Sequence, residues 1–236
     1  MKMINMESIK VIRGNIFNTK CQTIVNTVNC VGVMGKGIAL VFRLRYPEML
    51  PLYQEHCRNK LITIGKLWLY KTKNPHQPWV LNFPTKTHWK FPSEYAYIEE
   101  GLQKFIETYK ERNITSIAFP MLGTSNGGLD KEIVLDIMMK YLSVCDIPIE
   151  IYDYDPNAAD DLFETFKRNW NSIMPSDRKK VTGIRTQQQI DILNAGINNP
   201  QNKSMIQLMN MEGIGIKTME SCFNIVMNYV GMQKLL

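Results

Sequence analysis

The stretch of sequence that decides the fold is TIVNTVNCVGVMGKGIALVFRLR, residues 23–45. It opens with a β-branched, apolar run typical of a strand and closes with apolar residues at helical spacing. The three glycines between them, at positions 32, 35 and 37, let backbone N–H groups and a helix N-terminus face an anion. The stretch therefore predicts a strand, a phosphate-binding loop and a helix. For this loop alone, a plain tight turn stays open as the alternative.

A second glycine-rich loop, PMLGTSNGGLD at residues 120–130, follows another β-rich run. Asp130 is a favoured N-cap and precedes an apolar stretch with helical spacing, so this loop also runs from a strand into a helix. In an open α/β sheet such loops lie at the carboxyl ends of their strands, where ligands bind. Two loops of this kind favour a nucleotide site more strongly than either loop alone.

The same alternation of strands and helices continues to about residue 170, which predicts an α/β domain. The strands are expected at residues 9–13, 23–28, 66–70, 79–83, 116–119 and 149–152. The helices are expected at 37–45, 48–59, 93–109, 130–142 and 158–169, and Ser93 with Glu94 is expected to begin the third of them.

A polar joint, PSDRKK at residues 175–180, separates this domain from a tail with few β-rich runs. We expect the boundary near residue 171, with an α/β domain at 1–170 and a small helical segment at 171–236. Helices are expected at 203–210 and 216–229, and the Asn- and Gln-rich residues 194–202 are expected to form a loop.

The turn between the last two helices, MEGIGIKT at residues 211–218, resembles the helix-hairpin-helix motif. In that motif an apolar-Gly-apolar-Gly turn offers backbone N–H groups to a DNA phosphate without reading the base sequence. The resemblance implies a DNA contact at Gly213, Gly215 and Lys217. Two alternatives stay open: a turn that only joins two packed helices, and a tail that holds a protein partner.

The composition limits the class of protein. Of 236 residues, 44% are hydrophobic and 21% charged, which excludes disordered and collagen-like chains. The five cysteines are odd in number and lack zinc-site spacing, so a reduced, cytoplasmic protein without a metal is expected. No apolar run approaches the roughly 20 residues of a membrane span, and the first ten residues lack the apolar core of a signal peptide. The net charge of +6 favours an anionic partner.

Over about residues 8–168 the chain resembles the macrodomain family of ADP-ribose-binding proteins. The resemblance implies a three-layer α/β fold, with a mixed central sheet between helices. It places the adenosine after the opening strand, the distal ribose at the first glycine loop and the diphosphate at the second. Asn15 stands where the family usually has an aspartate. The implied ADP-ribose-binding residues are Asn15, Ile16, Asn26, Gly35, Lys36, Gly37, Leu122, Gly123, Thr124, Ser125, Asn126, Gly127 and Gly128.

Within this family the two loops, together with NFPTKTHW at residues 82–89, are most similar to the DarG-type antitoxins. Those enzymes remove ADP-ribose from thymidine bases in DNA. The similarity implies that Lys86 and Asn29 are catalytic, with Asn29 holding the distal ribose. A lysine amine can attack an anomeric carbon to form a Schiff base, so Lys86 would be the nucleophile or an acid to the leaving base. An ordinary exposed lysine is the alternative.

His88 and Trp89 follow Lys86 and are expected either to stack on a DNA base or, for Trp89, to cover the core. The implied function is an ADP-ribosyl hydrolase that acts on ADP-ribosylated DNA, without a cofactor, and counters a DNA-modifying toxin as its partner. Two other functions stay open. One is a non-catalytic ADP-ribose-binding module, and the other is a hydrolase of small ADP-ribose derivatives such as the 1''-phosphate or an acetylated form.

Overall fold

The computed structural model describes residues 8–74 and 77–228, and the chain divides into two compact units, residues 1–154 and 155–236. The sequence predicts this division near residue 171, so the predicted boundary differs by sixteen residues. The reason is helix α5 (Phe163–Ser172), which packs on α9 (Ile216–Asn228) of the second unit. The Asn169 amide donates to the Ile225 carbonyl at 3.2 Å, and Phe166 and Trp170 are fully buried.

A six-stranded sheet forms the centre of the first unit, in the order β1-β6-β5-β2-β4-β3. All neighbouring strands are parallel except β3 and β4, so the sheet is mixed, as the family resemblance implies. Each of the six expected strands is present, with its ends shifted by at most three residues. The strands are β1 (Ile9–Gly14), β2 (Thr23–Asn29), β3 (Trp68–Tyr70), β4 (Trp79–Lys86), β5 (Ile117–Pro120) and β6 (Ile149–Tyr154).

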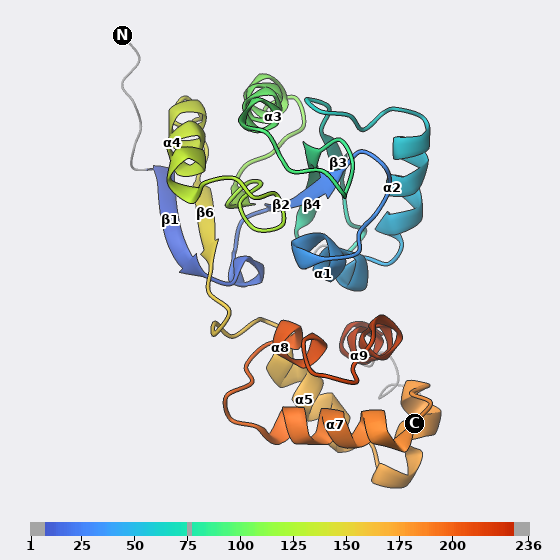
Figure 1. The fold of residues 1–236 in the computed structure, drawn as a ribbon. Coiled ribbons are helices and arrows are strands. Elements are labelled where there is room, and N and C mark those ends of the chain that lie inside the picture. The colour runs from blue at the N-terminus through green and yellow to red at the C-terminus, as the bar shows by residue number, and fades with distance from the viewer. Residues whose placement is uncertain (1–7, 75–76, 229–236) are drawn as a thin grey trace. The chain divides into compact units, whose positions relative to one another are not determined.

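Helices cover both faces of this sheet, which gives the expected three layers (Figure 1). Helices α3 (Tyr95–Thr108) and α4 (Lys131–Leu142) bury their apolar residues against alternate residues of the strands, including Leu81 and Phe83. Asn82 points to the opposite face, where its amide contacts Met49 of α2 (Met49–Arg58) at 3.6 Å. Helix α1 (Gly37–Arg45) has the predicted bounds and packs beside β2.

Two of the expected helix starts have different outcomes. Asp130 is the N-cap of α4, because its carboxylate accepts from the N–H groups of Glu132 at 2.9 Å and Ile133 at 3.1 Å. The expected start at Ser93 with Glu94 is right only for Glu94, which is the N-cap of α3 (Tyr95–Thr108), while the Ser93 N–H donates to the Gly127 carbonyl at 3.0 Å. A serine that would cap an isolated helix here supports the second glycine loop instead.

The second unit is helical, as expected of the tail. The expected loop at 194–202 is wrong in part, because α7 continues to Asn198 and buries Ile190, Leu193 and Ile197 at helical spacing. The expected helix at 216–229 runs to Asn228, and residue 229 lies outside the described residues. Besides α5 and α9, the helices are η3 (Pro175–Asp177), α6 (Arg178–Thr182), α7 (Gln187–Asn198) and α8 (Met205–Met209).

In the described part of the chain, no helix combines the length and the apolar character that crossing a membrane requires.

Candidate functional site

The candidate site lies where β2, β4 and β5 end. Strands β4 and β5 lie on either side of β2 and both pair with it in parallel, so all three carboxyl ends lie at one edge of the sheet. The first glycine loop leaves β2 here, the second leaves β5, and Lys86 is the last residue of β4. The Cys30 N–H donates to the Lys86 carbonyl at 3.1 Å, which joins the start of the first loop to the end of β4.

The two glycine loops lie against each other at Asn126. Gly37 begins α1 with a φ of +57°, and a Cβ added there would lie 2.6 Å from the Asn126 amide nitrogen. On its other side, the Asn126 carbonyl accepts a hydrogen bond from the Lys86 ammonium. Asn126 therefore joins both loops to the predicted catalytic lysine.

The electrostatics of Lys86 follow from its position between these loops. Its side chain is half-buried, and the loss of solvent lowers the pKa of the amine from the ordinary 10.5. Burial favours the neutral form because a charged ammonium is poorly solvated there. The shift is in the direction that nucleophilic chemistry by an amine requires.

Asn29 organises the first loop through its own side chain. Its amide donates to the Val33 carbonyl at 2.6 Å, and its oxygen accepts from the N–H groups of Val31 at 3.1 Å and Val33 at 3.3 Å. The Tyr53 hydroxyl donates to the Asn29 carbonyl at 2.5 Å. Asn29 is only 7% exposed, and the bond to Val33 uses one of the two N–H donors of its amide.

Two of the predicted ligand-binding residues lie beneath the surface. Asn26 is fully buried, and its amide donates to the Asn82 side-chain oxygen on the neighbouring strand at 2.9 Å. Leu122 is fully buried in the core between the sheet, α3 and α4. In this conformation both side chains lie beneath the loops, inside the domain.

The second loop is built around glycines that approach other backbone closely. Gly123 has a φ of +71°, and its carbonyl accepts from the Leu129 N–H at 3.1 Å. A Cβ at Gly127 would overlap the Gly123 carbonyl oxygen and lie 2.5 Å from the Ser93 hydroxyl. Ser93 is thus a loop-supporting residue that sequence reasoning missed, because its position suggests a helix cap instead.

The predicted adenosine residues lie at the same edge of the sheet, at the end of β1. Asn15 is 3% exposed, and its side-chain oxygen accepts from the Phe17 N–H at 3.1 Å, capping the short helix η2 (Ile16–Asn18). Ile16 is 5% exposed. Strands β6 and β5 separate β1 from β2, which at about 4.8 Å per strand puts their ends roughly 14 Å apart. This separation suits an extended ligand.

The residues predicted to contact DNA fall into two groups. His88 and Trp89 follow the end of β4, and Trp89 is 50% exposed, so it does not cover the core. Gly213, Gly215 and Lys217 belong to the second unit, where Gly213 has a φ of +85° in the turn between α8 and α9. Lys217 forms an exposed ion pair with Glu220 at 3.0 Å.

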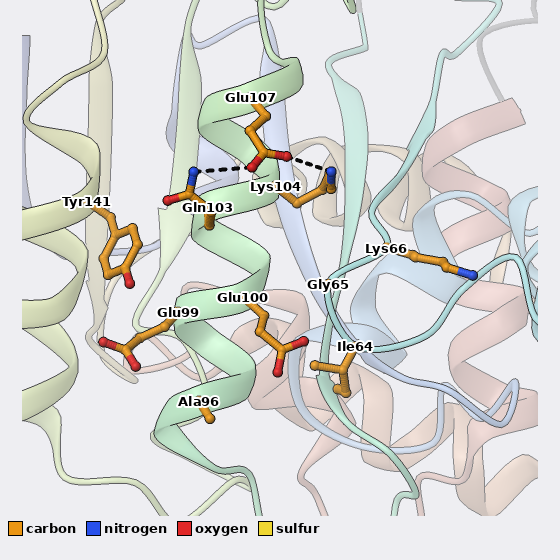
Figure 2. Close-up of a pocket in the computed structure, with 10 residues that line it drawn as sticks. All are labelled: Ile64, Gly65, Lys66, Ala96, Glu99, Glu100, Gln103, Lys104, Glu107 and Tyr141. Carbon is orange, nitrogen blue, oxygen red and sulfur yellow. Dashed lines mark hydrogen bonds and ion pairs between the residues drawn. The ribbon is translucent and has the colours of Figure 1, made fainter.

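A separate open pocket of about 540 Å³ lies over α3, away from the predicted residues (Figure 2). Its carboxylates, Glu99, Glu100 and Glu107, would repel a diphosphate. It therefore does not compete with the glycine loops as a site for ADP-ribose. The residues that line it are Ile64, Gly65, Lys66, Ala96, Glu99, Glu100, Gln103, Lys104, Glu107 and Tyr141.

Among residues 8–74 and 77–228, His, Cys, Asp and Glu side chains form no cluster of three or more that could hold a metal ion.

Comparison with known proteins gives a consistent result. The sequence model of the Macro domain family matches residues 25–138. A DNA ADP-ribosyl glycohydrolase of Mycobacterium tuberculosis is 50% identical over 120 residues, which are 50% of this chain and 34% of that protein. A DNA ADP-ribosyl transferase–DNA ADP-ribosyl glycohydrolase fusion protein of Thermosipho africanus is 38% identical over 162 residues, 62% of this chain and 42% of that protein. The chain thus spans less than half the length of these relatives.

Solved structures agree with this result. The macrodomain of Mycobacterium tuberculosis DarG is 44% identical, with a TM-score of 0.59, over 61% of this chain and 96% of that one. Thermosipho africanus DarTG in complex with ADP-ribose is 34% identical, with a TM-score of 0.61, over 73% of this chain and 44% of that one.

Proposed function

The chain belongs to the macrodomain family, and on this premise we propose that it is an ADP-ribosyl hydrolase that removes ADP-ribose from modified DNA bases, with thymidine as the base. The observation that carries the proposal is the contact of the Lys86 ammonium with the Asn126 carbonyl, at the point where the two glycine loops meet. The 50% identity to a protein named DNA ADP-ribosyl glycohydrolase supports this choice among the activities of the family.

In this proposal the ligand lies along the carboxyl edge of the sheet. The adenosine occupies the end of β1 at Asn15 and Ile16, and the diphosphate lies against the N–H groups of the second loop, from Gly123 to Gly128. The first loop, with Lys36 and the N-terminus of α1, faces the distal part of the ligand. Backbone N–H groups in a glycine-rich loop favour a bound anion, which supports the second loop as the place of the diphosphate.

The proposed reaction begins at the anomeric carbon of the distal ribose. The lone pair of the neutral Lys86 amine forms a bond to this carbon, and the bond from the carbon to the base breaks. The base keeps the electron pair and takes up a proton. The sugar ring then opens to a Schiff base on Lys86, and one water molecule hydrolyses it, which releases ADP-ribose and restores the amine.

The pH dependence of the reaction tests the role of Lys86. A nucleophilic amine must be neutral, and below its pKa the neutral fraction rises by about tenfold per pH unit. Burial lowers the Lys86 pKa, so we expect kcat/KM to rise with pH and level off below the ordinary lysine value of 10.5. The measurement is the rate of ADP-ribose release from modified DNA across this range. A rate that falls with rising pH would instead assign Lys86 as the acid.

The function itself is tested by comparing substrates at equal enzyme concentration. We expect release of free ADP-ribose from a single-stranded oligonucleotide that carries one ADP-ribosylated thymidine. Faster turnover of ADP-ribose 1''-phosphate or acetylated ADP-ribose would show a hydrolase of small derivatives. Tight binding of ADP-ribose in calorimetry, with no product from any of these substrates, would show a binding module.

The proposal extends to a partner and a cellular setting. A glycohydrolase of this kind would counter a DNA ADP-ribosyltransferase, and the fused relative from Thermosipho africanus supports such a pairing. All five cysteines are free thiols, which supports a reducing cytoplasm.

We further propose that the second unit binds DNA or the transferase partner, with Gly213, Gly215 and Lys217 at a DNA phosphate. Weaker binding of unmodified DNA by Lys217→Ala would support this role.

A further inference from the structure

Three aromatic side chains form a cluster directly after β4, and we call His88, Trp89 and Phe91 the aromatic platform. The His88 and Trp89 rings are stacked, with centroids 5.4 Å apart and an interplanar angle of 28°. The Phe91 ring lies 5.4 Å from His88 at an angle of 48°. Trp89 is 50% exposed and Phe91 58% exposed. The two largest rings of the platform thus present much of their surface to solvent.

The platform is not part of the core. Other aromatic residues of the first unit, such as Phe83 and Phe119, are fully buried and contribute to folding through that burial. Trp89 and Phe91 are half exposed, so they contribute less to stability through burial of apolar surface. The backbone around them is nevertheless fixed by hydrogen bonds. The Lys90 N–H donates to the His88 ring nitrogen at 3.2 Å, and the Phe91 N–H donates to the His88 carbonyl at 3.1 Å. The His88 ring and the backbone that carries the other two rings are therefore held by hydrogen bonds within the segment.

Positive charge accompanies the rings. The Lys90 ammonium lies 5.2 Å from the centre of the Trp89 ring, and Lys86 precedes His88 by two residues. Flat aromatic faces beside amines match the chemistry of a nucleic-acid strand, because bases stack on the rings and phosphates attract the amines. A purely apolar protein partner would not require these charges.

The platform also lies close to the proposed chemistry. Two residues of extended chain span at most about 7 Å, so His88 begins within this distance of the Lys86 backbone. A base bound at the platform would belong to a nucleotide near the one that Lys86 attacks. Resting on the function proposed above, we propose that the aromatic platform is a subsite that stacks the DNA base next to the ADP-ribosylated nucleotide.

This subsite favours substrates in which the base next to the ADP-ribosylated nucleotide is unpaired. In a duplex both faces of a base are already stacked, so binding at the platform requires a single strand or a base turned out of the helix. The substrate class is therefore a modified nucleotide within a single strand, in preference to an isolated modified nucleotide. Sequence reasoning includes His88 and Trp89, but it does not identify Phe91, whose contact with His88 only the fold reveals.

The test compares two substrates that differ only in the neighbouring bases. One is a short single strand with a central ADP-ribosylated thymidine, and the other is ADP-ribosylated thymidine monophosphate. We expect Trp89→Ala and Phe91→Ala each to lower kcat/KM for the single strand by about 10-fold, mainly through KM, and to leave the mononucleotide unchanged. Trp89→Phe should retain most of the wild-type rate. Val144→Ala, at a 63% exposed residue of the same unit, is the matched control and should change neither rate.

Other outcomes would overturn the subsite. Equal losses on both substrates would mean that the rings support the catalytic site itself. No loss on either substrate would exclude a base contact, and loss of toxin binding in the same variants would then assign the platform to a protein partner. If the wild-type protein turns over neither substrate, the proposed function fails. Anisotropy of an unmodified labelled single strand then still tests the platform, because weaker binding by Trp89→Ala would support it and equal binding would overturn it.

Discussion

Replacing Lys86 with alanine is expected to lower the single-turnover release of ADP-ribose from modified thymidine DNA by about 100- to 10,000-fold. The proposed reaction depends on an amine that can be neutral and lies between the two glycine loops. Lys86 is half-buried, its pKa is lowered by that burial, and its ammonium contacts the Asn126 carbonyl. Alanine removes the amine, so the bond to the anomeric carbon cannot form. ADP-ribose affinity should change far less than the rate.

A second substitution separates charge from chemistry. Arginine keeps the positive charge but does not lose its proton in proteins, so Lys86→Arg should be nearly as inactive as Lys86→Ala. Lys140→Ala, at an exposed lysine of α4, is the matched control and should keep the wild-type rate. An active Lys86→Ala protein would overturn the assignment of Lys86. An active Lys86→Arg protein beside an inactive Lys86→Ala protein would show that charge alone suffices.

Replacing Gly127 with alanine should disrupt ADP-ribose binding through the shape of the second loop. The added Cβ would overlap the Gly123 carbonyl oxygen and lie 2.5 Å from the Ser93 hydroxyl. The Gly123 oxygen is backbone and is held by the Leu129 N–H, so the loop must open to make room. We expect ADP-ribose affinity to fall by at least about 10-fold and the free energy of unfolding to fall by about 1–3 kcal/mol. Calorimetry and denaturant unfolding measure the two effects.

A control glycine distinguishes loss of the site from general destabilisation. Gly183 has a φ of +70° at the end of α6 in the second unit, and a Cβ there would meet no atom within 4 Å. Gly183→Ala should therefore lose about 1–2 kcal/mol of stability through backbone strain, with ADP-ribose affinity unchanged. Wild-type affinity in Gly127→Ala would contradict the proposed place of the diphosphate in this loop.

Local sequence patterns predict the elements of the first unit well, because each pattern depends on residues close together in the chain. Apolar, β-rich runs identify all six strands, and helical spacing gives the bounds of α1. Asp130 caps α4 because a side-chain oxygen reaches N–H groups two and three residues ahead. The prediction for Ser93 is wrong because a residue 34 positions away, Gly127, takes its N–H.

Sequence alone also indicates the chemical groups of the candidate site: two glycine loops, a lysine at a strand end and aromatic residues beside it. Their relations depend on the order of the strands, which places β5 and β4 on either side of β2. This order brings Lys86 to Asn126 across 40 residues of chain and buries Asn26 and Leu122.

Other features were likewise decided only by the fold. It leaves Trp89 and Phe91 exposed and assigns α5 to the second unit. Local periodicity therefore determined which elements form and which groups they carry. Burial, and contacts between segments far apart in the sequence, arise only when the chain folds. They decided which of those groups meet.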